Sequence, residues 1–151
     1  MDVLENRKEH LSSFIRLNEE WISKYFSLEK VDLELAENPG KIIDEGGYIF
    51  SIEEGGEVVG TCALLNKNAG EYELARMAVS PIYQGYGFGN KLMSAALNKA
   101  AQIGAKKVTL VSNTKLSAAI GLYKKFGCKV VSLGQHPVYS RANIVMAWCA
   151  S

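Results

Sequence analysis

Apolar residues near the start of the chain recur at spacings of three and four. Between Arg7 and Phe26 they form one stripe, with Leu11, Phe14, Ile15, Asn18, Trp21, Ile22 and Tyr25 as its members. This period predicts an amphipathic helix. A shorter helix is expected over 31–37, because the Asn38-Pro39-Gly40 sequence that follows would end it. Residues 1–6 offer only Val3-Leu4 as strand-forming residues, so a sheet that begins one strand short and a remodelled N-terminus are both open.

The rest of the chain alternates between strand and helix patterns. Strands are expected over 48–52, 58–65, about 72–79, 108–111, 129–133 and 144–148, and helices over 90–103 and 115–126. Gly104 and Gly127 follow these two helices and suit left-handed helix ends. The element order predicts an α/β (α+β) fold, with a mixed, mostly antiparallel central sheet of about six or seven strands flanked by helices. At 151 residues, a single domain over 1–151 is expected.

Composition narrows the class of protein. No apolar run approaches the roughly 18–20 residues of a membrane span, and the acidic N-terminus lacks the layout of a signal peptide, so we expect a cytoplasmic protein. Three separated cysteines and two distant histidines argue for reduced core thiols and against a metal site. No nucleic-acid-binding motif is present.

Charge is divided unevenly along the chain. Residues 1–60 hold 6 basic and 14 acidic residues, a balance of −8, whereas residues 61–151 hold 11 basic and 2 acidic residues, a balance of +9. One interpretation is two solvated faces of opposite sign. The other is an anionic ligand bound by the second half and a cationic one met by the first.

A glycine-rich segment, Gln84-Gly85-Tyr86-Gly87-Phe88-Gly89, lies between a predicted strand and a predicted helix. The first amides of a helix have no intrahelical partner and attract anions, and glycines let the backbone approach phosphate oxygens. The Rossmann pattern fails because position 90 is Asn, and the P-loop pattern fails because no glycine in this loop precedes a lysine.

The pattern that fits is Gln/Arg-x-x-Gly-x-Gly/Ala, and it resembles the acetyl-CoA loop of the GNAT superfamily of N-acetyltransferases. Three further segments resemble the same family: 73–81 its fourth strand, 110–113 its fifth strand, and 118–127 the helix after it. About residues 48–133 match in order and spacing. The resemblance implies a GNAT-like acyl-CoA N-acyltransferase fold and acetyl-CoA as co-substrate, with no metal.

The resemblance also implies the donor site. Backbone amides of the loop would hold the pyrophosphate, and the main chain of the fourth strand would hold the pantetheine arm and the thioester oxygen. Apart from the resemblance, lysines 124 and 125 could meet CoA phosphates or form a solvated helix face. The implied cofactor-binding residues are Met77, Ala78, Val79, Gln84, Gly85, Tyr86, Gly87, Phe88, Gly89, Asn90, Asn113, Tyr123 and Lys125. Asn113 also suits a turn or N-cap.

Two residues are the catalytic candidates. Tyr123 matches the family tyrosine near the thioester sulfur, and as an ordinary phenol it is protonated at neutral pH and able to act as general acid. Glu73 matches the glutamate base of the histone-acetylating branch, acting directly or through a water; loss of the proton to solvent is the alternative. Glu73, Ala75, Met77 and Val79 share a face only if the strand has no bulge, and the resemblance implies a bulge nearby.

The acceptor is less defined. The acidic residues of the first helices would attract a protonated amine, which favours a cationic small molecule or a peptide amine over an anionic acceptor; they are Glu19, Glu20, Glu29, Asp32, Glu34 and Glu37. Tyr139, Arg141 and Asn143 either face the acceptor or form a surface loop. We expect an N-acetyltransferase, with an acyl-CoA sensor as alternative. The acceptor's identity, the acyl length and a homodimer are left open.

Overall fold

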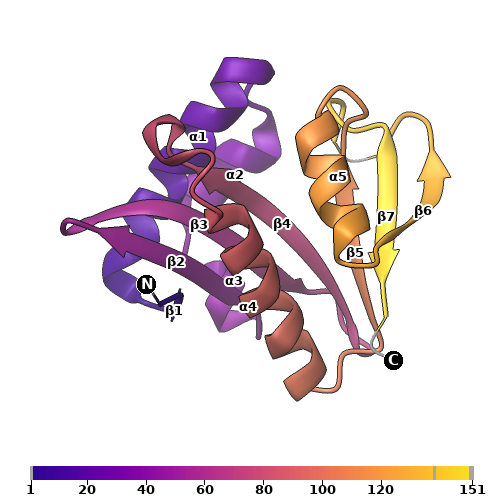
Figure 1. Cartoon of the computed structure of the whole chain (residues 1–151), viewed down its shortest axis with the longest axis horizontal. Coiled ribbons are helices and arrows are strands. Elements are labelled where there is room, and N and C mark those ends of the chain that lie inside the picture. The colour runs from indigo at the N-terminus through magenta and orange to yellow at the C-terminus, as the bar shows by residue number, and fades with distance from the viewer. Residues whose placement is uncertain (1, 138, 150–151) are drawn as a thin grey trace.

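The computed structural model describes residues 2–137 and 139–149, and its centre is a seven-stranded sheet (Figure 1). The strands are β1 (Leu4–Glu5), β2 (Tyr48–Glu54), β3 (Glu57–Asn66), β4 (Glu71–Val79), β5 (Lys107–Ser112), β6 (Lys129–Leu133) and β7 (Ile144–Trp148). Their spatial order is β1-β2-β3-β4-β5-β7-β6. Of the described strand pairs, β4–β5 is parallel and the other five are antiparallel. The predicted mixed, mostly antiparallel sheet is confirmed.

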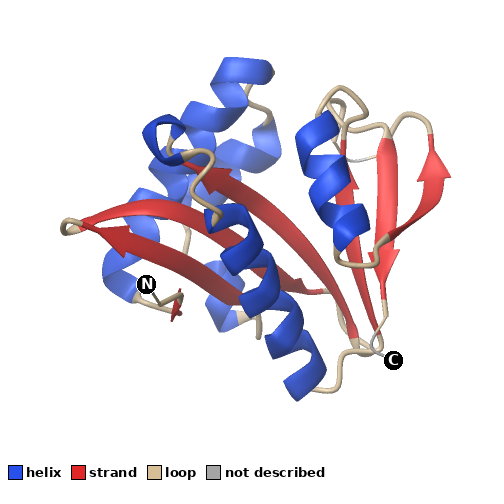
Figure 2. Ribbon diagram, viewed as in Figure 1, coloured by secondary structure: helices blue, strands red, loops and turns tan. Residues whose placement is uncertain are grey.

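Helices cover both faces of this sheet (Figure 2). They are α1 (Leu11–Tyr25), α2 (Lys30–Glu37), α3 (Lys41–Asp44), α4 (Phe88–Gln102) and α5 (Ser117–Lys125). Helix α4 packs on one face of β2–β4, where Leu92, Met93 and Ala96 are fully buried. On the opposite face Phe14 of α1 and Ile42 of α3 pack against β2 and β3. Among residues 2–137 and 139–149, no helix has the length and apolar character that a membrane span needs.

Several element boundaries differ from the sequence-based expectation. The segment 8–10 is a short 3-10 helix before α1, the four-residue α3 was not predicted, and α4 begins at Phe88 rather than Asn90. Cys62 and Cys128 are buried as expected, whereas the prediction of a core thiol is wrong for Cys149, which is exposed after the end of β7.

The first strand exists but is only two residues long. Leu4 and Glu5 pair with Ser51 and Phe50 of β2, so the alternative of a sheet that begins one strand short is wrong. Asn6, at a φ of 53°, then turns the chain and bonds the backbone N–H of Ile49 through its side-chain oxygen at 2.8 Å. Because two residues give no recognisable alternation, the pattern alone did not reveal this strand.

A β-bulge interrupts β4 at the centre of the sheet. Thr61 of β3 pairs with Ala78, but Ala63 pairs with Ala75, so β4 holds one extra residue here, and Arg76 has a left-handed φ of 60°. Bulges increase local twist and reverse the alternation of side chains. Met77 and Val79 therefore pack toward the core beneath α4, and Glu73 and Ala75 lie on the opposite face, so these four residues do not share one face.

Both of the predicted glycine helix ends are confirmed. Gly104 and Gly127 have φ values of 72° and 90°. At the second, the Cys128 N–H donates to the Tyr123 carbonyl at 3.0 Å and the Gly127 N–H donates to that of Lys124 at 3.0 Å, which is the Schellman pattern. This motif fixes the last turn of α5, the turn that carries Tyr123.

Candidate active site

Strands β4 and β5 separate along their length and open a groove between them. They pair only from Glu71–Lys107 to Leu74–Leu110, after which β4 continues to Val79 without β5 beside it. In Figure 1 the two strands meet at one end and diverge toward α1 and α5. A groove of about 300 Å³ lies there, lined by β4, the end of β5, α1, α5 and the segment 139–142. The bulge at Arg76 lies where β4 and β5 separate. Bulges increase the local twist of a strand, which turns β4 away from β5 at this point.

The glycine-rich loop lies between the end of β4 and the first turn of α4. Gly87 is the N-cap of α4 with a φ of 80°, and Gly85 has a φ of 88°. A side chain at either position would meet nothing within 4 Å, so the space beside the loop is open. Tyr83 stacks on the buried Phe88 at 5.8 Å and fixes the loop to the core. The helix start has no side-chain cap and the glycine faces are open, and together they form a cradle of the kind that favours anion binding.

A positive charge lies beside this cradle. The Lys125 Nζ of α5 donates to the Asn90 Oδ1 of α4 at 2.8 Å, so the ammonium group is held near the first turn of α4. Helices α4 and α5 lie close together here, since a Cβ on Gly89 would be in contact with Leu122 of α5 at 3.4 Å. The structure thus brings together the predicted residues Gly87, Asn90 and Lys125, although they come from two helices.

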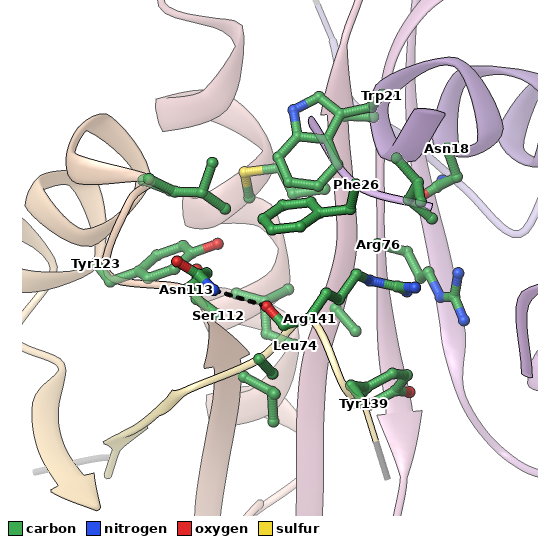
Figure 3. A pocket seen from close by; sticks show the side chains of 18 of the residues that line it. Asn18, Trp21, Phe26, Leu74, Arg76, Ser112, Asn113, Tyr123, Tyr139 and Arg141 are labelled. Carbon is green, nitrogen blue, oxygen red and sulfur yellow. Dashed lines mark hydrogen bonds between the residues drawn. The ribbon is translucent and has the colours of Figure 1, made fainter. Parts of the chain in front are cut away.

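Tyr123 lines the groove from α5, and its side chain extends toward the middle of the groove (Figure 3). Its ring packs against the core beneath α4. Burial raises the pKa of Tyr123 to about 12, with nearby Cys62 and Cys128 acting in the same direction. The phenol is therefore protonated throughout the neutral range and is a hydrogen-bond donor into the groove.

Asn113 also lines the groove, at the end of β5. Its Oδ1 accepts from the Lys115 N–H at 2.9 Å, and its Nδ2 donates to the Arg141 carbonyl at 2.8 Å, the bond dashed in Figure 3. The N-cap of α5 is Leu116, so Asn113 is a turn residue rather than the cap. Asn113 therefore connects the end of β5 to the segment before β7 by a hydrogen bond.

Glu73 lies at the other side of the groove, where β4 and β5 are still paired. It is 7% exposed, and the Lys67 Nζ is 3.7 Å from its Oε1. Burial raises the pKa of the Glu73 carboxyl, and the positive charges of Lys67 and Arg76 offset that effect only in part. A carboxylate with a raised pKa is a better proton acceptor than an ordinary glutamate.

Two arginines line the same part of the groove and point side by side (Figure 3). Arg141 donates to both oxygens of Asp32 at 2.7 and 2.8 Å and to Glu29 at 2.9 Å, and Arg76 donates to Asp32 at 2.6 Å. Burial alone would raise the pKa of Asp32, but the bonds from Arg141, the Glu29 amide and Arg76 lower it. This ionic cluster joins α2 to β4 and to the segment before β7.

The acidic residues of the first helices are therefore not all free to meet an acceptor. Glu29 and Asp32 are counter-ions of Arg141, and Glu20 and Glu34 pair with Arg16 and Lys30 at 3.5 and 3.7 Å. Of the three loop candidates, Tyr139 and Arg141 line the groove, whereas Asn143 bonds Thr114.

Several residues that line the groove were not predicted as site residues, among them Trp21, Phe26 and Arg76. Trp21 was assigned to the apolar stripe of the first helix and Phe26 to the end of that helix, whereas in the structure both line the groove and Phe26 follows α1. Arg76 carried a usable signal, because it is the one charge in the run Leu74–Val79 and a charge in a central strand needs a partner.

Comparison with known proteins agrees with this geometry. Residues 12–128 match the model of the acetyltransferase (GNAT) family. The uncharacterized N-acetyltransferase YvbK of Bacillus subtilis is 29% identical over 109 residues, 70% of each chain. The uncharacterized N-acetyltransferase Mb2688 of Mycobacterium bovis is 29% identical over 122 residues, 81% of this chain and 69% of the relative.

Solved structures show the same fold. A GNAT-family acetyltransferase from Staphylococcus aureus has a TM-score of 0.85 at 18% identity over 97% of this chain and 96% of its own. The putative acetyltransferase yncA from Salmonella typhimurium, solved with its cofactor acetyl-CoA, has a TM-score of 0.77 at 19% identity over 99% and 93%. With a family match over most of its length and the splayed strands and helix-capping loop described above, the chain belongs to the GNAT family of acetyl-CoA-dependent N-acetyltransferases.

Proposed function

We propose that the protein transfers the acetyl group of acetyl-CoA to a primary amine by direct attack within a ternary complex. The observation that carries the proposal is that one groove, opened by the splay of β4 and β5, is lined by both Tyr123 and Glu73 and reaches Gln84 of the glycine loop. A proton donor and a proton acceptor with raised pKa values thus share one cavity.

The donor would lie with its pyrophosphate at the cradle. The amides of residues 84–90, the dipole of α4 and the Lys125 ammonium all favour an anion there. Two of these amides already have backbone partners, since Gln84 N–H donates to Pro81 at 3.4 Å and Tyr86 N–H to Tyr83 at 3.3 Å. The first turn of α4 and the glycines therefore carry most of the phosphate binding.

The thioester would lie along the unpaired part of β4. After Leu74 this strand has no β5 partner, so main-chain groups of Met77, Ala78 and Val79 along that edge can bond the pantetheine arm. An amide that bonds the thioester oxygen would stabilise the oxyanion formed on attack. Asn113 contributes from the facing strand end, where its side chain already holds the Arg141 carbonyl.

In the transfer step the amine nitrogen attacks the thioester carbon, a C–N bond forms and the C–S bond breaks. Glu73 accepts the proton that the ammonium group must lose, directly or through a water. The Tyr123 hydroxyl donates to the departing sulfur. Because its pKa of about 12 exceeds that of a thiol, its contribution is chiefly a hydrogen bond to the thiolate.

Release of free CoA thiol, followed with Ellman's reagent over a panel of amines, tests the proposal. We expect thiol release that depends on both the enzyme and an amine, together with a matching acetylated product by mass spectrometry. Acetyl-CoA binding in calorimetry without thiol release for any amine would instead support a sensor of acyl-CoA. Comparing acetyl-CoA with propionyl-CoA in the same assay defines the acyl length.

We expect the Glu73→Gln variant to lose the acidic limb of the pH–activity profile. In the unmodified protein kcat/KM should fall as the pH drops through the Glu73 pKa, a limb that lies above the ordinary 4.5 of glutamate because burial raises it. Removal of a general base lowers kcat by about 10²-fold or more. The pH dependence of kcat/KM measures both effects.

The control is Glu71→Gln, two residues away on the same strand but exposed. It should leave the profile unchanged. Since the folded pKa of Glu73 is raised, its ionisation at neutral pH costs stability, and Glu73→Gln should keep or raise the Tm at pH 7. An acidic limb that persists in Glu73→Gln would exclude Glu73 as the base.

A further inference from the structure

The left-handed residue in the β-bulge of β4 is an arginine. Arg76 has a φ of 60°, and the register places both Arg76 and Met77 opposite the single residue Cys62 of β3. For a residue with a Cβ this conformation is disfavoured by about tenfold in population, which is why glycine is common at left-handed positions of bulges. Contacts with the rest of the protein therefore have to hold Arg76 in it.

An ion pair with Asp32 of α2 supplies such a contact. The Arg76 guanidinium donates to the Asp32 Oδ1 at 2.6 Å, and the two side chains are 8% and 2% exposed. Asp32 is itself fixed, because it accepts from the Glu29 N–H at 2.8 Å and from two Arg141 nitrogens at 2.7 and 2.8 Å. It cannot move without breaking these bonds, so it gives the Arg76 guanidinium one defined position.

The conformation of Arg76 decides how the following part of β4 faces the groove. Before the bulge Leu74 still pairs with β5, whereas Ala78 and Val79 after it pair, among the described strands, with β3 alone. The other edge of these residues borders the groove. A change of φ at position 76 would rotate the N–H and carbonyl groups along that edge, which are the groups proposed above to bond the pantetheine arm and the thioester oxygen.

We infer that Arg76 and Asp32 are positioning residues for the acetyl donor: their ion pair holds the bulge in its left-handed conformation and so fixes the β4 edge that binds the donor. This rests on the donor position given under the proposed function. It extends that function to Asp32, which lies on α2 and is not among the described residues that line the groove.

Two substitutions at position 76 separate backbone conformation from charge. Arg76→Ala and Arg76→Gly both remove the guanidinium and leave Asp32 paired with Arg141, but only glycine adopts a left-handed φ without strain. We expect Arg76→Ala to raise the Kd of acetyl-CoA and to lower kcat, each by about tenfold, because the binding-competent conformation becomes less populated. Arg76→Gly should restore most of both losses. Calorimetry and the thiol-release assay measure them.

Binding of ADP shows whether the effect is local to β4. ADP has a pyrophosphate like that of CoA but no pantetheine arm, so its Kd should be the same in the unmodified protein and in both variants. A parallel loss of ADP affinity would indicate a general disturbance and overturn the inference. Equal acetyl-CoA affinities for Arg76→Ala and Arg76→Gly would also overturn it, since the packing of Met77 and Val79 beneath α4 would then hold the bulge without Arg76.

Ala69→Gly is the matched control for the glycine substitution. Ala69 also has a left-handed φ, 55°, but lies exposed in the turn before β4 and away from the groove. Relief of strain there should leave the acetyl-CoA Kd and kcat unchanged. A gain as large as the difference between the two variants at position 76 would assign that difference to backbone strain in general and contradict the inference.

Asp32→Asn tests the partner of Arg76. It should raise the acetyl-CoA Kd in the unmodified protein and cause no further change in Arg76→Gly, where the bulge no longer needs the ion pair; Arg141 keeps Glu29 as a partner in both. A further loss in the Arg76→Gly background would mean that Asp32 acts by another route. If Asp32→Asn does not fold, the comparison at position 76 decides. If no amine releases thiol, the proposed transfer fails, and the Kd values for acetyl-CoA and ADP still decide the inference.

Discussion

Replacing Gly87 with aspartate should abolish measurable binding of acetyl-CoA. The added carboxylate would project into the open space beside the N-cap of α4, where the pyrophosphate is expected. Two like charges about 4 Å apart repel by roughly 4 kcal/mol at an effective dielectric of about 20, which is on the order of a thousandfold in affinity. Calorimetric titration with CoA measures the loss.

The backbone strain of this substitution needs its own control, because Gly87 has a left-handed φ. Gly56, in the turn between β2 and β3, has a φ of 83° against 80° for Gly87, and a Cβ there also meets nothing within 4 Å. Gly56→Asp should therefore carry the same strain and charge and keep full CoA affinity. If Gly87→Asp bound CoA as well as Gly56→Asp does, the pyrophosphate would not lie at this loop.

Replacing Tyr123 with phenylalanine should lower kcat by about 10²-fold and leave CoA affinity nearly unchanged. This is the lower end of the rate effect usual for a general acid, because a hydroxyl whose pKa is about 12 acts mainly through its hydrogen bond to the leaving sulfur. The ring remains, so packing against the core is kept. Steady-state kcat and calorimetric Kd separate the two effects.

Tyr48→Phe is the matched control for that variant. Tyr48 on β2 packs against the same core cluster but does not line the groove. It should retain the kcat of the unmodified protein. A Tyr123→Phe variant with unchanged kcat would remove this hydroxyl from the reaction.

Local signals in the sequence account for what could be predicted. Gly104 and Gly127 stand at left-handed helix ends, and the order of strands and helices gave the mixed sheet. The glycine loop could be recognised because the conformation it needs depends on glycine, and glycines are visible in the sequence itself. Tyr123, in contrast, was predicted from the resemblance of residues 118–127 to a helix of the family, and not from the local pattern alone.

What could not be predicted depends on contacts between distant residues. Arg76 adopts a left-handed φ that arginine does not favour by itself, and its bond to Asp32 joins positions 44 residues apart. The bond between Arg141 and Asp32 spans 109 residues. The bulge, which places Met77 and Glu73 on opposite faces, was implied by the family resemblance alone. Neither the bulge nor the pairing of Asp32 with two arginines has a signature in local periodicity.

The ionic cluster around Arg141 has a consequence for how specificity can be engineered in this chain. The residues that we propose for donor binding lie in one continuous stretch, 77–125, whereas other residues that line the groove come from the end of α1 and from the segment 139–142. The ion pairs of Arg141 with Glu29 and Asp32 connect these two end segments to each other. The two segments therefore form one exchangeable unit, provided that the incoming pair again supplies a carboxylate for Arg76 of β4: swapping both together should then transfer acceptor choice, whereas swapping either alone would leave a buried charge without its partner and weaken the fold.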